Sequence, residues 1–399
     1  MSFTTGARRR RPSLFTLILL TALGALSTNL FLPSLDNMAR DFGVPYGVMQ
    51  IAISGYLAGS AVIQLVVGPM ADRFGRRPVM LGALAVFILA SAGTLLAESA
   101  GVFLFFRILQ AAVMSGTVLS RAMISDLAAG RAASMMGYVT MGMSLVPMVA
   151  PVIGGRLEAA FGWHGAFSVL LAVGVLSLAW CWRDLGETMT TPGIPLREQL
   201  RRYPILARSV RFWGYCLTST LNAGSFFAYL GGASFVGAQV FHLDPVTVGN
   251  WFAAPAVGYM IGNALAGRLS GRFGIDGMVL TGSALTTAAL GMALAISLAG
   301  GESPLVFFGA VSVMAIGNGM AMPNAMAGMM SVRPDLAGTA SGFGGSMMVA
   351  GGAGLATLAG ALLVPGSSSA VLLAIMAASA FGSVLAILWV IRSRPRMLG

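Results

Sequence analysis

The sequence has no lysine, and it has only two cysteines and two histidines among 399 residues. Charged side chains make up 9% of the chain, whereas soluble domains carry roughly a quarter. This chain therefore cannot cover a water-facing surface of its size, which excludes an ordinary soluble protein. No histidine lies near Cys181 or Cys216, so we expect no metal site. Both cysteines lie near predicted cytoplasmic helix ends, where thiols stay reduced, so we expect no disulfide.

Apolar residues are abundant instead, at 57% of the chain with a mean hydropathy of +0.84. They fall in runs of about 20 residues, the length that a helix needs to cross a bilayer. We count twelve such runs, which leave no room for a soluble domain. They begin near Leu14, Tyr46, Pro78, Val102, Ser134, Gly165, Phe212, Thr247, Met278, Pro304, Gly338 and Ser369.

The arginines are sorted by the loops between these runs. All of them fall on one side except Arg40 and Arg156, which fall on the other, and Arg107, which lies within a run. The positive-inside rule then places both termini in the cytoplasm. This topology, with attraction to anionic lipid headgroups, explains the net charge of +11. A nucleic-acid partner is not needed, and the lipid bilayer is the expected one.

A short polar loop recurs in both halves of the chain. GPMADRFGRRP at 68–78 returns in weaker form as GRLSGRFGIDG at 267–277. Parallel repeats of this kind are typical of one large class of solute transporters. We therefore predict an all-α membrane protein with two six-helix bundles, 1–183 and 210–399. The polar segment 184–209 is the expected cytoplasmic linker, either solvated or carrying a short interfacial helix.

The first copy of the loop resembles the signature G-x-x-x-D-R-x-G-R-R of the major facilitator superfamily. Three further segments, TNLFLPSL (28–35), RILQAAVMSG (107–116) and VPMVAPVIGG (146–155), are similar to motifs of its drug-efflux subgroup, which includes chloramphenicol and bicyclomycin exporters. The matching signature residues are Gly68, Asp72, Arg73, Gly75, Arg76 and Arg77.

The resemblance implies a monomer in a bacterial inner membrane that exports small drug-like molecules. It implies no cofactor, and the proton gradient is the expected driving force. Alternating access would then come from rocking of the two bundles. Span 5 adds the export motif, in which prolines kink the helix and glycines allow close packing; these are Pro147, Pro151, Gly154 and Gly155.

The signature loop is the predicted gate. Asp72 can face the positive N-terminus of the helix that starts near Gly338, and Arg76 can pair with Asp126 after the fourth span. The alternative is that these arginines only fix the topology.

Arg107 is the basic residue inside a span, which makes it a functional candidate by default. Gln110 and Met114 follow at helical spacing on the same face, and Asn29 of the first span falls at a similar depth. We expect these four residues to form a polar cluster on the wall of a central cavity. The alternative is an arginine that reaches the outer headgroups.

Relatives of the drug-efflux subgroup usually carry Asp where this chain has Asn29. An amide cannot carry a proton, so this residue weakens the expectation of proton coupling, and the nearby Asp36 is expected in water. A cavity with a cation and no carboxylate favours neutral or anionic amphipathic solutes. We expect Phe226, Tyr229 and Asn318 to line it as well.

Two rival functions remain. One is a metabolite permease of the same fold, uncoupled because of Asn29. The other is a membrane enzyme, which would need a convergent nucleophile and base. The histidines, His164 and His242, fall in outer loops of different halves, so we do not expect an enzyme.

Overall fold

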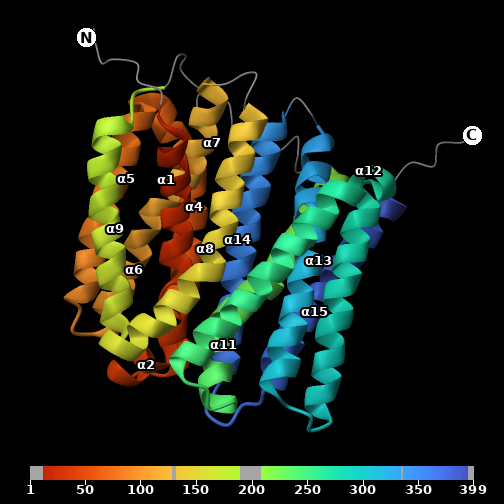
Figure 1. The fold of residues 1–399 in the computed structure, drawn as a ribbon. Coiled ribbons are helices and arrows are strands. Elements are labelled where there is room, and N and C mark those ends of the chain that lie inside the picture. The colour runs from red at the N-terminus through yellow and green to blue at the C-terminus, as the bar shows by residue number, and fades with distance from the viewer. Residues whose placement is uncertain (1–11, 128–131, 189–207, 334–335, 394–399) are drawn as a thin grey trace, which may run out of the picture.

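The computed structural model describes residues 12–127, 132–188, 208–333 and 336–393, without the side chains at 125–127, 132–145, 148, 337–339 and 341. Within these residues the chain is helical, and none of them lies in a strand. The helices form two groups that run roughly along one axis, and the described chain begins and ends at the same end (Figure 1). We call this end the inner end and the opposite one the outer end.

The first group contains the helices that precede residue 188. They are α1 (Leu14–Asn29), the 3-10 turn η1 (Leu32–Ser34), α2 (Leu35–Asp41), α3 (Tyr46–Met49), α4 (Ile51–Phe74), α5 (Arg76–Leu95), α6 (Ala100–Leu109), the 3-10 turn η2 (Gln110–Met114), α7 (Ser115–Leu127), α8 (Ala132–Phe161) and α9 (Trp163–Asp184).

The second group follows residue 208. It consists of α11 (Val210–Phe235), the π-helical turn η3 (Val236–Val240), α12 (Pro245–Leu298), α13 (Pro304–Ser331), α14 (Ala337–Leu362) and α15 (Ser369–Arg392). Most of the linker that we expected at 184–209, with its possible interfacial helix, lies outside the described residues. Its bounds and those of the two bundles stay predictions.

Local sequence signals explain where many helices start. A capping serine precedes five of the helices, and Asp244 precedes α12. Each of these side chains accepts a hydrogen bond from a backbone N–H of the first turn, which satisfies an otherwise unpaired donor. Proline occupies the first position of α12 and of α13, where its missing N–H costs nothing. The capping serines are Ser13, Ser99, Ser209, Ser303 and Ser368.

Nine helices of the described part are long and apolar enough to cross a membrane. One of them, α12, has 54 residues, about 80 Å of helix at 1.5 Å per residue. It turns back at Gly274, where φ is 70° and ψ is 169°, so its two arms run in opposite directions (Figure 1). This single element therefore contains the two spans that we expected to begin near Thr247 and Met278.

The same backbone geometry occurs 199 residues earlier, at Gly75, where φ is 97° and ψ is 152°. Arg-Phe-Gly precedes both turns, at 73–75 and at 272–274. Glycine adopts positive φ at little cost, which explains its presence at both positions. The repeat seen in the sequence is thus a repeat of structure.

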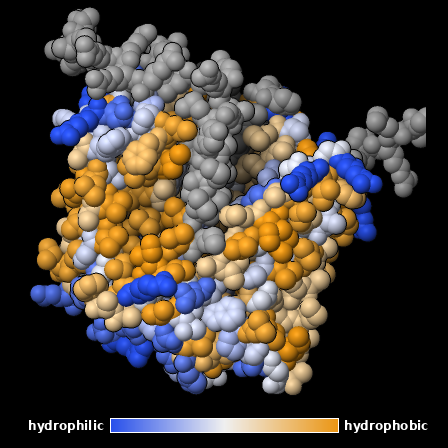
Figure 2. Space-filling model, in the orientation of Figure 1, coloured by the Kyte–Doolittle hydropathy of each residue, from blue (hydrophilic) through white to orange (hydrophobic). Residues whose placement is uncertain are grey.

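The surface between the two ends is apolar. Figure 2 shows a broad hydrophobic band over the helices, with hydrophilic residues gathered toward the ends. Leu89, Leu305 and Met292 are 71%, 70% and 66% exposed. Exposed apolar area on this scale fits a protein that is solvated by lipid.

Candidate functional site

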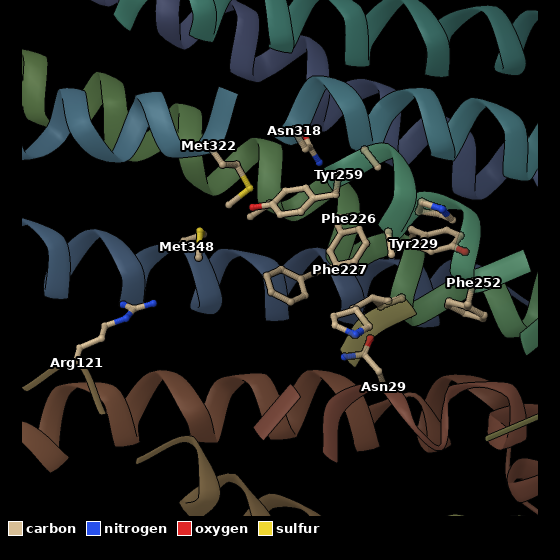
Figure 3. Close-up of a pocket in the computed structure, with 16 residues that line it drawn as sticks. Asn29, Arg121, Phe226, Phe227, Tyr229, Phe252, Tyr259, Asn318, Met322 and Met348 are labelled. Carbon is tan, nitrogen blue, oxygen red and sulfur yellow. The ribbon is translucent and has the colours of Figure 1, made fainter. Parts of the chain in front are cut away.

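A cavity of about 330 Å³ lies between the two groups of helices (Figure 3). The first group contributes residues of α1, α7 and α8, and the second contributes residues of α11 to α14. The lining consists of Asn29, Arg121, Pro147, Ala223, Phe226, Phe227, Tyr229, Leu230, Phe252, Pro255, Ala256, Tyr259, Ala315, Asn318, Met322 and Met348.

Aromatic rings dominate one part of this cavity. The Tyr229 ring lies 5.1 Å from that of Phe252 and 6.2 Å from that of Phe226, measured between centroids. The hydroxyl of Tyr229 is buried and has no hydrogen-bond partner among the described residues. Tyr229 and Phe252 are 1% and 3% exposed, whereas Phe226 is half-buried, so the ring of Phe226 is open to an aromatic ligand and the other two support it.

Two amides add polar points to the lining. Asn29 is 5% exposed, and its Nδ2 donates to the carbonyl oxygen of Ala25 at 2.7 Å. Asn318 is 2% exposed and donates to the carbonyl oxygen of Asn222 at 3.2 Å. The structure therefore brings together four of the expected lining residues, Asn29, Phe226, Tyr229 and Asn318.

Arg121 of α7 is the formally charged member of the lining, and no Asp or Glu accompanies it there. Its side chain is exposed and lies toward the inner end of the cavity, near Met348 (Figure 3). The sorting of arginines by loops assigns this residue to topology alone. Its position inside the apolar segment Ala100–Ile124 was the available signal, since a charge within a span is functional by default.

The structure corrects our expectation for Arg107. This residue is 0% exposed and lies inside the first group of helices, not on the cavity wall. Its Nε donates to the carbonyl oxygen of Ala52 at 3.1 Å, its Nη1 to Ser27 Oγ at 3.0 Å and to Gln110 Oε1 at 2.6 Å, and its Nη2 to the carbonyl oxygen of Ser27 at 2.7 Å. The guanidinium does not reach the outer headgroups either.

Aromatic rings complete the surroundings of Arg107. Its guanidinium lies 4.2 Å from the Tyr56 ring centroid and 4.4 Å from that of Phe31, so cation–π attraction offsets part of its burial. The neighbouring Gln110 extends this hydrogen-bond network, because its Nε2 donates to Ser91 Oγ at 2.9 Å. Met114 packs near Gly24 within the same group of helices.

At the outer end the two groups are in close contact through glycines. A Cβ at Gly155 would collide with the carbonyl oxygen of Pro245, and one at Gly249 with that of Pro151. A Cβ at Gly47 would lie 2.6 Å from the carbonyl oxygen of Gly360. We call this contact the outer seam. The export motif thus lies at the seam, with Gly154 packed against Leu30 of its own group and Pro147 in the cavity lining.

Hydrogen bonds also cross the outer seam. Tyr46 donates its hydroxyl to the carbonyl oxygen of Gly231 at 2.8 Å, and Ser234 donates to the carbonyl oxygen of Leu32. Gln239 Nε2 donates to both carboxylate oxygens of Asp36, at 2.9 and 3.1 Å. Asp36 is 5% exposed. The expectation that it lies in water is wrong, because it is buried in the seam.

The inner end is different, because the signature loop contacts its own group. Asp72 pairs with Arg76 at 2.8 Å, and the backbone N–H groups of Arg76 and Arg77 donate to Glu187 at 3.0 and 3.2 Å. A Cβ at Gly68 would meet nothing within 4 Å. The cavity is thus bounded by the outer seam, and its lining reaches Arg121 toward the inner end.

The remaining gate predictions are only partly visible. Arg73 lies over the Phe74 ring at 5.2 Å, and the Arg77 Nη2 donates to the carbonyl oxygen of Trp182 at 3.0 Å. The side chains of Asp126 and of residues 338–339, the expected partners of Arg76 and Asp72, lie outside the described ones. The gate formed by the signature loop at the inner end stays a prediction.

Comparison with known proteins agrees with this architecture. A family model described as Major Facilitator Superfamily matches residues 17–357 and 217–399. The bicyclomycin resistance protein homolog of Haemophilus influenzae is 29% identical over 381 residues, which cover 94% of each chain. Multidrug resistance protein D of Escherichia coli K12 is 29% identical over 370 residues, 89% of this chain and 90% of that protein.

A shorter match and a solved structure add to this. The chloramphenicol resistance protein of Pseudomonas aeruginosa is 33% identical over 210 residues, 52% of this chain and 50% of that protein. The crystal structure of a bacterial homolog of the human lysosomal transporter Spinster, in an inward-facing and occupied conformation, has a TM-score of 0.73, 16% identity and 95% coverage of both chains. At that identity the structural match shows the fold.

The family model spans nearly the whole chain. It therefore covers both helical groups, the repeated glycine turn and the cavity between the groups. As a member of a transporter family, the chain is a multi-pass membrane protein and not an enzyme. The chain belongs to the major facilitator superfamily.

Proposed function

We propose that this protein exports small, drug-like, amphipathic compounds from the cytoplasm by alternating access. One observation carries the proposal: an aromatic and apolar cavity, lined without a carboxylate, is bounded by the outer seam and reaches Arg121 toward the arginine-rich inner end. A solute from the inner side can enter such a site, and rocking of the two groups would release it on the other side.

The lining favours neutral or anionic compounds such as amphenicols. Flat apolar molecules can stack on the ring of Phe226, while the amides of Asn29 and Asn318 offer hydrogen bonds. An organic cation would meet Arg121 and find no compensating acid. The names of two relatives, which mention resistance to bicyclomycin and to chloramphenicol, support this class of compound.

The proposed location is the bacterial inner membrane, with the arginine-rich inner end and both termini in the cytoplasm. We propose a monomer without a cofactor, driven by the proton gradient. Asn29 lies in the cavity but cannot take up a proton, which favours a second candidate, an uncoupled permease of the same fold.

Susceptibility tests can decide the substrate class. The unmodified protein, the test variant Phe226→Ala and the control variant Leu89→Ala would each be expressed in a strain that lacks its own exporters. We expect resistance to chloramphenicol and not to ethidium, lost with Phe226→Ala and kept with Leu89→Ala, which changes an exposed side chain. Resistance to ethidium alone would contradict the proposal.

Proteoliposomes separate the two candidates for coupling. An imposed pH gradient should accelerate chloramphenicol transport if protons are exchanged. Transport that runs down the solute gradient at one rate, with or without the pH gradient, would establish the uncoupled permease.

A further inference from the structure

The cavity is polar at one end and aromatic at the other. Figure 3 places Arg121 at one end, the rings of Phe226, Tyr229 and Phe252 at the other, and Met322 and Met348 between them. Methionine side chains are flexible and adapt to ligands of varied shape. The cavity thus has a cationic head and an apolar body joined by an adaptable middle.

From this arrangement we infer that Arg121 is a specificity-determining residue, which binds the acidic group of an elongated aromatic anion while the aromatic body of that solute lies against the ring of Phe226, which Tyr229 and Phe252 support. The inference rests on the proposed function and narrows it from neutral or anionic compounds to a preference for carboxylates and similar acids. The acidic group would point to the inner end.

One chemical principle and two observations support this assignment. A guanidinium matches the planar geometry of a carboxylate and can bind it through two hydrogen bonds. The lining holds no Asp or Glu that would compete for the guanidinium. The other intramembrane arginine, Arg107, cannot serve, because its hydrogen bonds to Ala52, Ser27 and Gln110 hold it inside the first group of helices.

The competing explanation is that Arg121 only obeys the positive-inside rule, since it lies toward the inner end. Under that explanation any arginine at this end would matter equally, and the charge of the solute would not. Arg392 at the end of α15 is a matched control, because it is exposed at the same end and is not part of the cavity lining.

Three fluorescent probes with one aromatic body make the test direct: dansylglycine is an acid, dansyl amide is neutral and dansylcadaverine is a cation. Their binding to the purified full-length protein in detergent is measured by the rise in dansyl fluorescence. For the unmodified protein we expect the order acid, amide, cation, from tightest to weakest.

The variants then assign the preference to a residue. Arg121→Gln should weaken binding of dansylglycine by about tenfold and leave that of dansyl amide nearly unchanged. Arg121→Lys should keep part of the preference, and Arg121→Glu should reverse it in favour of dansylcadaverine. Arg392→Gln should behave like the unmodified protein. Unchanged binding of the amide also shows that each variant is folded.

Several outcomes overturn the inference. If Arg121→Gln binds dansylglycine as the unmodified protein does, or if Arg392→Gln weakens it equally, Arg121 does not select anions. An equal loss of acid and amide binding would assign Arg121 a structural role. If none of the three probes binds to the unmodified protein, both the proposed function and the inference are wrong. If all three bind equally well whatever their charge, the inference alone is wrong.

Discussion

The two ends of the contact between the helical groups differ in how their glycines are used. At the outer end Gly155, Gly249 and Gly47 let one backbone touch the other, so that no Cβ would fit. At the inner end a Cβ at Gly68 or at Gly267 would meet nothing within 4 Å. Small residues permit close helix approach in membranes, and among the described residues this close approach between the two groups is seen at the outer end.

Glycine-lined surfaces between the two groups can therefore be in contact at one end in one conformational state and at the other end in the second state. In the structure the outer seam is closed, while the signature loop is tied to its own group through Asp72–Arg76 and Glu187. Alternating access would exchange these roles. Substitutions at either end should therefore shift the balance between the two states in opposite directions.

The largest effect is expected from Gly155→Val at the outer seam. Its side chain would collide with the carbonyl oxygen of Pro245, a backbone atom that cannot move aside, so the seam could not close and transport should be lost. Opening is measured with Leu32→Cys in a background without the native cysteines. Leu32 is 0% exposed and should react with an impermeant maleimide only when the seam opens.

Gly101→Val is the matched control, because Gly101 is exposed and a Cβ there meets nothing within 4 Å. It should leave both transport and labelling unchanged. Normal transport by Gly155→Val would show that the closed seam is not part of the cycle.

Asp72→Asn at the inner end should leave membrane insertion intact and lower transport by about tenfold. In the predicted outward-facing state the carboxylate would lose its favourable place at a helix N-terminus, an effect of about 1 kcal/mol, so this state would become less populated. Labelling of Leu32→Cys should fall. Glu98→Gln, an exposed acid at the outer end, is the control. Export at the normal rate would refute the gate.

Gln50 offers a test in which the expected change in seam opening is opposite to that of Gly155→Val. It is 0% exposed, and neither its Nε2 nor its Oε1 has a hydrogen-bond partner among the described residues. The amide is wedged in the outer seam, where added Cβ atoms at Gly231 and Gly360 would each lie 2.7 Å from it. Burying an unpaired polar group costs about 1–3 kcal/mol, so Gln50 favours opening.

Gln50→Met removes that cost and keeps the shape. Labelling of Leu32→Cys should therefore fall several-fold, and transport should slow because the seam opens less often. Gln50→Glu places a charge in the same position and should raise the labelling. Identical labelling of both variants would mean that the amide has no role in opening.

The smallest effect is expected from Asp244→Ala, which removes the cap of α12 beside Pro245. The Thr247 hydroxyl donates to the Asp244 carboxylate at 2.6 Å, and the backbone N–H groups of Thr247 and Val246 donate at 3.0 and 2.9 Å. These hydrogen bonds lower the pKa of Asp244 below its ordinary value of 3.8. Loss of such a cap costs about 1 kcal/mol, which should lower the thermal stability of the purified protein slightly.

The sign of the pH dependence follows from the lowered pKa. The cap contributes fully above pH 3.8 and loses its contribution as the pH falls through the lowered pKa. The difference in melting temperature between the unmodified protein and Asp244→Ala should therefore shrink in acid. Asp244→Asn, which keeps an oxygen acceptor, should lie between the two at neutral pH.

Much of the fold could be read from the sequence. The expected starts at Leu14, Tyr46, Pro304 and Ser369 are the first residues of α1, α3, α13 and α15, because a serine or proline marks the end of each preceding loop or the first turn. The repeat at 68–78 and 267–277 predicted two related segments, and each contains a turn with a glycine at positive φ, Gly75 and Gly274. These signals are local in the chain.

The site was less predictable. The spacing of Arg107 and Gln110 correctly placed them in contact, with 2.6 Å between Nη1 and Oε1. It did not say whether that face looks into the first group of helices or into the cavity, because both are lined by helices of similar composition. For Arg121 the sequence led to the opposite mistake. Its position near a loop suggested a residue that only fixes the topology, whereas it lines the cavity.

The sequence by itself therefore determined which segments lie in the membrane, which ends carry the arginines and where the chain repeats, since hydrophobic length, charge and glycine act locally. Tertiary structure alone decided that Asp36 is buried in the outer seam, that Arg107 is enclosed and that Arg121 is open to the cavity. The physical reason is that a helix offers several faces, and only packing against distant helices selects the one that meets a solute.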